Sequence, residues 1–212
     1  MPSTATFLAV SLIALGMVLT PGPNMVYLIS RSITQGRAAG VISLIGVILG
    51  FVFYVFAAAF GLQALVLAVP LAYDIIRWAG AAYLLYLAWT SVKPGARSPL
   101  QPRLDLPHDG PHRLLAMGFF TNLLNPKIAV LYLSLIPQFI DPAAGPVLMQ
   151  FILLGLTQIA VSFTVNLAIV FACGSFALWL ATRPAWLAVQ RWFMGGVLAA
   201  LAVRLALEPR PA

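Results

Sequence analysis

The sequence TPGPN at residues 20–24 interrupts one long apolar stretch, and NLLNPK at residues 122–127 interrupts another in the second half of the chain. Proline has no backbone N–H and displaces the carbonyl one turn earlier, so each motif predicts a broken helix. Lipid offers no hydrogen bonds, so a break at membrane depth must be buried in protein or line a wet cavity. Matching breaks in two halves of a chain are typical of a transporter's substrate site.

Composition places the chain in a lipid bilayer. Of its 212 residues, 62% are hydrophobic and only 8% are charged, whereas soluble domains have about 25% charged residues. The net charge of +7 is carried between apolar runs, as in cytoplasmic loops, so it does not indicate nucleic-acid binding. Each crossing needs about 20 apolar residues. We therefore predict an all-α integral membrane protein with six transmembrane helices, near residues 5–30, 38–67, 72–92, 114–139, 146–177 and 184–207.

The basic residues predict the orientation of these spans. Eight of them fall on one side of the membrane, namely Arg31, Arg37, Lys93, Arg97, Arg103, Arg113, Arg183 and Arg191. The other side receives Arg77, Arg204 and Arg210. An excess of Lys and Arg marks the cytoplasmic side, so we expect both termini to lie outside. The first span has no basic residue before it, and we expect it to remain as a helix rather than to be cleaved as a signal peptide.

A proline-rich segment at residues 93–113 divides the chain into two halves, residues 1–92 and 114–212, within a single membrane domain. It is predicted to be a flexible cytoplasmic linker. Three spans in each half cross in opposite directions, so the layout predicts two inverted repeats whose first helices, the first and fourth of the chain, are broken. The linker contains His108 and His112 near Asp105 and Asp109. Their spacing favours a solvated polar loop over a metal site.

Lys127 is the most informative charged residue. Thirteen uncharged residues precede it and thirteen follow it, which places it near the bilayer midplane. A lysine at that depth costs about 2.5–3.5 kcal/mol on insertion scales, so it must meet water, a partner or a ligand. The middle of each span lacks Asp and Glu. The expected partners are freed carbonyls, Asn side chains and a substrate carboxylate, while a purely structural pairing stays open.

The two breaks predict a binding site. A helix that restarts after a break directs its positive end into the cavity, where it can hold the carboxylate of an amino-acid ligand. Asn side chains supply both donors and acceptors for the rest of the ligand. We predict that substrate is bound by Asn24, Asn122, Asn125 and Lys127. The residues that shape the breaks are Pro21, Gly22, Pro23 and Pro126.

Other polar and small residues support the same picture less directly. Gln158, Ser162 and Asn166 share one face of the fifth span, where they either bond to other helices or line the cavity. Tyr27 lies deep enough to line the cavity, although core packing is the default for such a residue. The glycine-rich face that includes Gly46 and Gly50 permits close helix packing or a homodimer. The single cysteine, Cys173, is expected to be a small packing residue.

Enzyme functions find little support. The sequence has no HExxH motif, no P-loop and no histidine within a span. No pair of carboxylates lies at membrane depth for acid–base chemistry. We therefore expect neither a catalytic residue nor a metal nor a cofactor.

These motifs resemble the signatures of a known family, the lysine exporter superfamily. The first comprises residues 20–24 with RS at 31–32 and GRAAG at 36–40. The second is GFFTNLLNPK at 118–127 with PQF at 137–139, and WAGAAYLLYL at 78–87 is similar to the family's third helix. The resemblance extends over about residues 4–207 and is greatest to the homoserine/threonine exporter branch. It implies efflux of an amino acid or a close derivative across a bacterial inner membrane, driven by the membrane potential or proton gradient.

Two alternatives stay open from the sequence. The chain could export another small solute or a cation within the same superfamily, or it could be a membrane scaffold subunit that transports nothing. The group that would carry a proton also stays open. Asp74 and Asp141 lie near span ends, and Lys127 or the substrate itself could serve instead.

Overall fold

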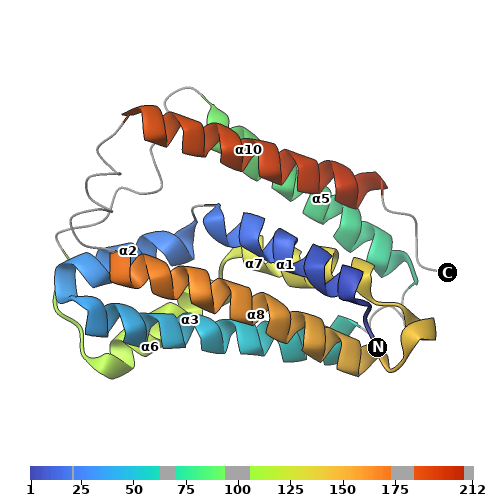
Figure 1. The fold of residues 1–212 in the computed structure, drawn as a ribbon, viewed down its shortest axis with the longest axis horizontal. Coiled ribbons are helices and arrows are strands. Elements are labelled where there is room, and N and C mark those ends of the chain that lie inside the picture. The colour runs from blue at the N-terminus through green and yellow to red at the C-terminus, as the bar shows by residue number, and fades with distance from the viewer. Residues whose placement is uncertain (21, 63–69, 94–105, 173–183, 208–212) are drawn as a thin grey trace.

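Helices make up the regular structure of the described residues, which contain no β-strand (Figure 1). The computed structural model describes residues 1–20, 22–62, 70–93, 106–172 and 184–207. Its long helices are α1 (Thr4–Leu19), α2 (Pro23–Gln35), α3 (Arg37–Ala57), α5 (Pro70–Val92), α6 (Pro111–Leu123), α8 (Val147–Ala172) and α10 (Pro184–Leu207). The shorter elements are α7 (Pro126–Val130), the π turns η1 (Ala58–Leu62) and η2 (Leu131–Leu135), and the 3-10 turns η3 (Ile136–Phe139) and η4 (Pro142–Ala144).

Helices occupy all six places where spans were predicted. Two are long and apolar enough to cross a bilayer alone, Arg37–Gly61 with mean hydropathy 2.6 and Val147–Ala172 with 1.9. Two bent pairs meet the same requirements when each is taken as one span, so the described residues hold two to four candidate spans. α5 and α10 have 23 and 24 residues, long enough to cross at 1.5 Å per residue, but they are not among these candidates.

The predicted helix breaks are present in both halves. α1 and α2 meet at 57°, and α6 meets the segment Pro126–Phe139 at 53°. In each case a proline occupies the first position of the restarting helix, Pro23 in α2 and Pro126 in α7. That position tolerates proline because its N–H would have no helical acceptor. Pro21 lies outside the described residues.

Small residues let two helices from different halves pack closely. α3 makes its most extensive contact with α6, and α5 makes its most extensive contact with α10 (Figure 1). A methyl group built at Gly46 would lie 2.1 Å from the Leu115 carbonyl oxygen, and one at Gly118 would lie 2.3 Å from the Ser43 carbonyl oxygen. The glycine-rich face of α3 is therefore used within the chain, and a homodimer would have to use another surface.

The linker ends earlier than the sequence predicted. α6 begins at Pro111, and Asp109 is a buried ion-pair partner rather than a solvated loop residue, with its side chain only 3% exposed. Its carboxylate lies 2.6 Å from the guanidinium of Arg31, which is 2% exposed. A buried arginine needs such a counter-charge, and this requirement fixes the end of the linker against α2. Asp105 lies outside the described residues. Among the described residues there is no group of three metal-ligating side chains.

Figure 1 shows how the halves combine. α5 and α10 lie side by side, while α3, α6 and α8 lie together on the opposite side. The segments that contain the two breaks, α1–α2 and α7, lie between these groups. α1 contacts both α8 and α10, and α7 contacts α5. The arrangement places the interrupted backbone in the interior of the protein, as a break at membrane depth requires.

Candidate functional site

The two helix breaks meet in the interior of the protein. Asn125, which caps the start of α7, donates from its side-chain nitrogen to the side-chain oxygen of Asn24 at 3.4 Å. The other end of the same amide accepts a hydrogen bond from the Lys127 backbone N–H at 3.1 Å. Asn24 lies in the first turn of α2. One amide from each half therefore contacts the other at the centre of the molecule.

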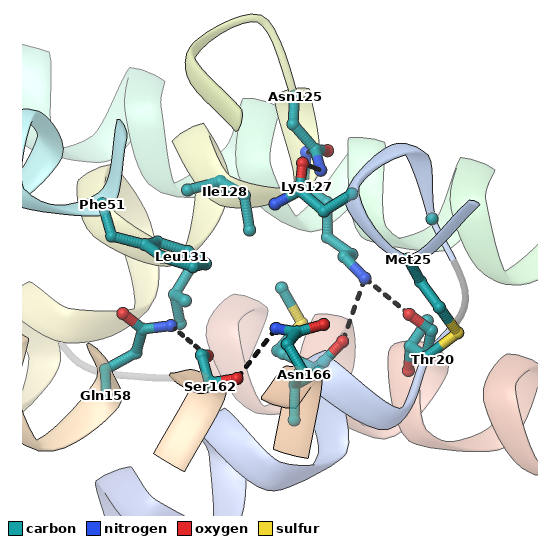
Figure 2. Close-up of a pocket in the computed structure, with 14 residues that line it drawn as sticks. Thr20, Met25, Phe51, Asn125, Lys127, Ile128, Leu131, Gln158, Ser162 and Asn166 are labelled. Atoms are coloured by element: carbon teal, nitrogen blue, oxygen red, sulfur yellow. Dashed lines mark hydrogen bonds between the residues drawn. The ribbon is translucent and has the colours of Figure 1, made fainter. Parts of the chain in front are cut away.

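The side chain of Lys127 extends from the break before α7 to the break after α1. Its Nζ donates to the carbonyl oxygens of Met17 at 2.9 Å and Thr20 at 2.7 Å, both at the end of α1 (Figure 2). In an uninterrupted helix the Met17 carbonyl would accept from the N–H of residue 21, which is a proline and has none. The side chain is buried, with 8% of the residue exposed. The described residues provide no carboxylate ion pair to it, so the predicted carbonyl partners are the ones found.

The N-terminal end of α2 lies beside this ammonium group. Gly22 caps the helix without a side-chain hydrogen bond, and Pro23 follows it. A methyl group built at Gly22 would lie 3.1 Å from Lys127 Nζ, so the lack of a side chain there lets the ammonium approach the break. Free N–H groups in the first turn give this end a partial positive charge. Backbone donors and the Lys127 side-chain nitrogen are thus adjacent.

Polar side chains of α8 complete the site. Gln158 donates to Ser162 Oγ at 2.7 Å, and Asn166 donates to the Ser162 carbonyl at 2.8 Å (Figure 2). Gln158 also bonds through its side-chain oxygen to the hydroxyl of Tyr132. These contacts form a polar ladder along one helix face. All three residues line the cavity, and Gln158 also bonds to another element through Tyr132 of η2, whereas the Ser162 and Asn166 bonds lie within α8.

The enclosed cavity is small. Its volume is about 20 Å³, roughly enough for one water molecule. Its polar lining comes from both breaks and from α8, and its apolar lining comes from α1, α2, α3, α7 and η2. The residues that line it are Met17, Val18, Thr20, Gly22, Asn24, Met25, Phe51, Asn125, Lys127, Ile128, Leu131, Gln158, Ser162 and Asn166. The sequence analysis did not single out Thr20 or Met17 as hydrogen-bond partners of Lys127. The Met17 carbonyl could have been found, because Pro21 has no N–H to donate to it.

Two predicted residues lie elsewhere. Asn122 is fully buried, does not line the cavity, and packs against Gly50, where an added methyl would lie 2.7 Å from Asn122 Cβ. Neither polar atom of its amide has a hydrogen-bond partner among the described residues. Tyr27 donates to the Leu114 carbonyl at 2.7 Å and accepts from Ser43 at 3.1 Å. It lines a separate hollow between α2 and α6.

The donors and acceptors of the cavity suit a molecule that carries both charges. An anion would meet the Lys127 ammonium and the start of α2, whose donors lie at one wall. A cation would meet the Met17 and Thr20 carbonyls, together with the side-chain oxygens of Asn24 and Asn166. Both kinds of group lie within one buried site formed by the two halves. The described residues hold no group of three His, Cys, Asp or Glu side chains, so the arrangement fits a zwitterion better than a metal ion.

A helical membrane protein with paired breaks and a buried polar site belongs to the class of membrane carriers. The sequence profile described as LysE type translocator matches residues 15–209. The chain therefore belongs to the LysE type translocator family, which confirms the resemblance seen in its motifs. It is a multi-pass bacterial membrane transporter rather than an enzyme.

Similar proteins with assigned names match most of the chain. A homoserine/homoserine lactone efflux protein of Salmonella typhimurium (strain LT2) is 32% identical over 162 residues, which are 76% of this chain and 77% of that protein. Leucine efflux proteins of Enterobacter sp. (strain 638) and Salmonella choleraesuis (strain SC-B67) are each 28% identical over 198 residues. These matches cover 90% of both chains for the first and 91% for the second. No solved structure is significantly similar to this chain.

Proposed function

We propose that the protein is a secondary transporter that exports a neutral amino acid, or a close derivative such as homoserine, from the bacterial cytoplasm. The observation that carries the proposal is the contact of Lys127 with the end of α1. This contact lies beside the start of α2, which has no side-chain cap. This contact places a cation, free backbone donors and the carbonyls at the end of α1 in one buried site. The efflux proteins that resemble the chain supply the direction and the substrate class.

The proposed binding mode follows from the charges of an amino acid. Its carboxylate pairs with Lys127 Nζ and accepts from the first N–H groups of α2. Its ammonium takes the Met17 and Thr20 carbonyls that Lys127 occupies in this structure, so the lysine side chain turns from them toward the carboxylate. Asn24 and Asn125 provide further contacts, and the α8 ladder, formed by Gln158, Ser162 and Asn166, bounds the site.

Access to the site is proposed to alternate between the two sides of the membrane. The cavity has room for about one water, so binding requires the halves to separate around the breaks. We include Asn122 in the site on this basis, because a movement of α6 away from Gly50 would release its unpartnered amide. Pro21, Pro23 and Pro126 with Gly22 act as the hinges of this movement.

The proposed topology is that of six spans in two inverted repeats, residues 1–92 and 114–212, in one membrane domain. The prediction of cytoplasmic residues 93–113 and of both termini outside rests on the distribution of Lys and Arg. We also propose that the proton-motive force drives efflux. The lining of the cavity contains no Asp or Glu among the described residues, so Lys127 or the substrate itself would carry any coupled charge.

The decisive experiment uses purified protein in proteoliposomes. Radiolabelled homoserine, threonine, leucine and lysine are loaded, and efflux is measured with a pH gradient and a membrane potential imposed separately. We expect efflux of at least one neutral amino acid, accelerated by one of the two gradients. A carrier of another solute or a cation would move none of these amino acids, and a scaffold subunit would move no solute at all. Either result contradicts the proposal.

A further inference from the structure

A second and larger hollow adjoins the polar cavity. It has a volume of about 540 Å³, within the range of about 300–1,000 Å³ that small-molecule sites occupy. It lies between α2 and α6, and its lining consists of Gly22, Pro23, Val26, Tyr27, Ser30, Arg31, Leu106, Met117 and Thr121. Gly22 also lines the cavity that contains Lys127. The two spaces therefore share one wall residue, Gly22, which has no side chain.

The walls of this hollow are mainly apolar. Val26, Leu106 and Met117 line it, and two of the polar side chains around it, Tyr27 and Arg31, are engaged with other groups. The guanidinium of Arg31 is turned to the Asp109 carboxylate at 2.6 Å, and the Tyr27 hydroxyl donates to a backbone carbonyl. The hollow thus offers little to a charged group and a favourable surface to hydrocarbon.

One of the two spaces is polar and the other is apolar, as are the backbone and the side chain of an aliphatic amino acid. The cavity beside Lys127 has the donors and acceptors but room for only about one water. The hollow has the volume but few available polar groups. A ligand bound past Gly22 would place its charged end at Lys127 and its hydrocarbon in the hollow, and Gly22 itself has no side chain to obstruct it.

We propose that this hollow is the side-chain subsite of the transported amino acid, and that Val26 and Met117 select an aliphatic side chain by filling the space around it. The inference rests on the proposed function. It assigns a place to the substrate side chain, for which the polar cavity alone has no room. The shared wall residue Gly22 distinguishes this hollow from another groove of about 440 Å³ between α1 and α8. That groove shares no lining residue with the polar cavity.

The test compares three amino acids that share a backbone and a net charge, namely alanine, leucine and phenylalanine. Efflux of each is measured from proteoliposomes for Met117→Trp and Val26→Phe, which fill the hollow from α6 and from α2, and for Met117→Ala, which enlarges it. Ala160→Trp, placed in the groove between α1 and α8, is the matched control for added bulk. Each rate is normalised to the protein reconstituted.

The expected result is a change in selectivity. Because one methylene in an apolar pocket changes discrimination about 10-fold to 200-fold, each filling variant should lower the leucine-to-alanine ratio by roughly tenfold or more. Met117→Ala should raise the phenylalanine-to-leucine ratio, and Ala160→Trp should leave both ratios as in the wild type. Ratios that stay at wild-type values in all three hollow variants would overturn the subsite and leave the hollow to a lipid chain. The proposed function would be overturned as well if the wild-type protein moved none of the three amino acids. It would also be overturned if the efflux rates of the wild type and of Lys127→Ala were equal.

Discussion

Lys127 Nζ donates a hydrogen bond of 2.7 Å to the carbonyl of Thr20, although the two residues are 107 positions apart in the chain. The same ammonium takes the Met17 carbonyl, whose helical donor is missing because residue 21 is proline. A charged donor gives stronger hydrogen bonds than a neutral one. A single side chain therefore joins the two interrupted helices, and it does so at the carbonyls that a substrate ammonium would need.

We predict that Lys127→Ala abolishes efflux while the protein stays in the membrane. The variant removes the cation that we propose pairs with the substrate carboxylate, and it leaves the α1 carbonyls without their donor. Efflux of radiolabelled amino acid should fall to the level of empty proteoliposomes. Lys93→Ala is the matched control, because Lys93 is the only other lysine in the chain and is exposed at the end of α5. Efflux at the wild-type rate from Lys127→Ala would exclude the lysine from the site.

Gly22→Ala should impair transport by sterics alone. Gly22 has φ −167°, an extended conformation that any residue adopts, so the backbone is not strained by the change. The added methyl would lie 3.1 Å from Lys127 Nζ and would displace it. Because a shift of about 1 Å in a binding group can cost about a hundredfold in rate, we expect roughly tenfold to hundredfold slower efflux. Gly196→Ala in α10, where an added methyl meets no atom within 4 Å, should transport normally, and equal rates for the two variants would contradict the argument.

Much of the fold could be predicted from local sequence, because each feature depends on nearby residues. The apolar runs predicted the helices, and the proline motifs predicted where two of them break. Counting uncharged residues on either side predicted Lys127 to lie in the middle of a span. Its need for carbonyl partners follows from the absence of a nearby acid. The polar face of α8 follows from helical spacing, which placed Gln158, Ser162 and Asn166 on one side.

The placement of Asn122 could not be predicted in this way. Asn122 and Asn125 are three residues apart and would share a face of a continuous helix. The chain leaves the helix at Leu124, with φ −88° and ψ 7°, so the two amides point to different neighbours. Asn125 meets Asn24, whereas Asn122 meets Gly50 of α3. Which helix packs against a glycine stripe depends on the whole fold and not on the motif.

The buried pair of Arg31 and Asp109 was also missed, for the same reason. Its members belong to α2 and to the segment before α6, and only tertiary packing brings them together. Arg31 donates further to the Gln35 side chain at 2.8 Å and the Pro107 carbonyl at 2.9 Å. Gln35 in turn donates to the Asp109 carbonyl at 3.0 Å. The end of the linker is thereby attached to the first half of the chain.

Asp109→Ala should destabilise the protein strongly. Removal of one member of a buried ion pair leaves the other charge uncompensated, which costs about 3–5 kcal/mol. Arg113 also contacts Asp109 at 3.0 Å but is 70% exposed, so Arg113→Ala should cost less than about 1 kcal/mol. Unfolding by denaturant in detergent micelles, followed by circular dichroism, measures both free energies. Similar values for the two variants would show that burial does not set the strength of this pair.

Asn122→Ala separates binding from stability. The Asn122 amide is buried without a partner among the described residues, and an unpartnered buried polar group costs about 1–3 kcal/mol. Its removal should therefore leave the free energy of unfolding unchanged or raise it, despite the small cavity left beside Gly50. Asn166→Ala is the comparison, because that amide donates to the Ser162 carbonyl at 2.8 Å, and its loss should lower stability by about 0.5–1.5 kcal/mol. If Asn122 contacts substrate when α6 moves, efflux from the stable Asn122→Ala variant should fall roughly tenfold. A variant that unfolds more easily than wild type yet transports at the full rate would make Asn122 a packing residue and remove it from the proposed site.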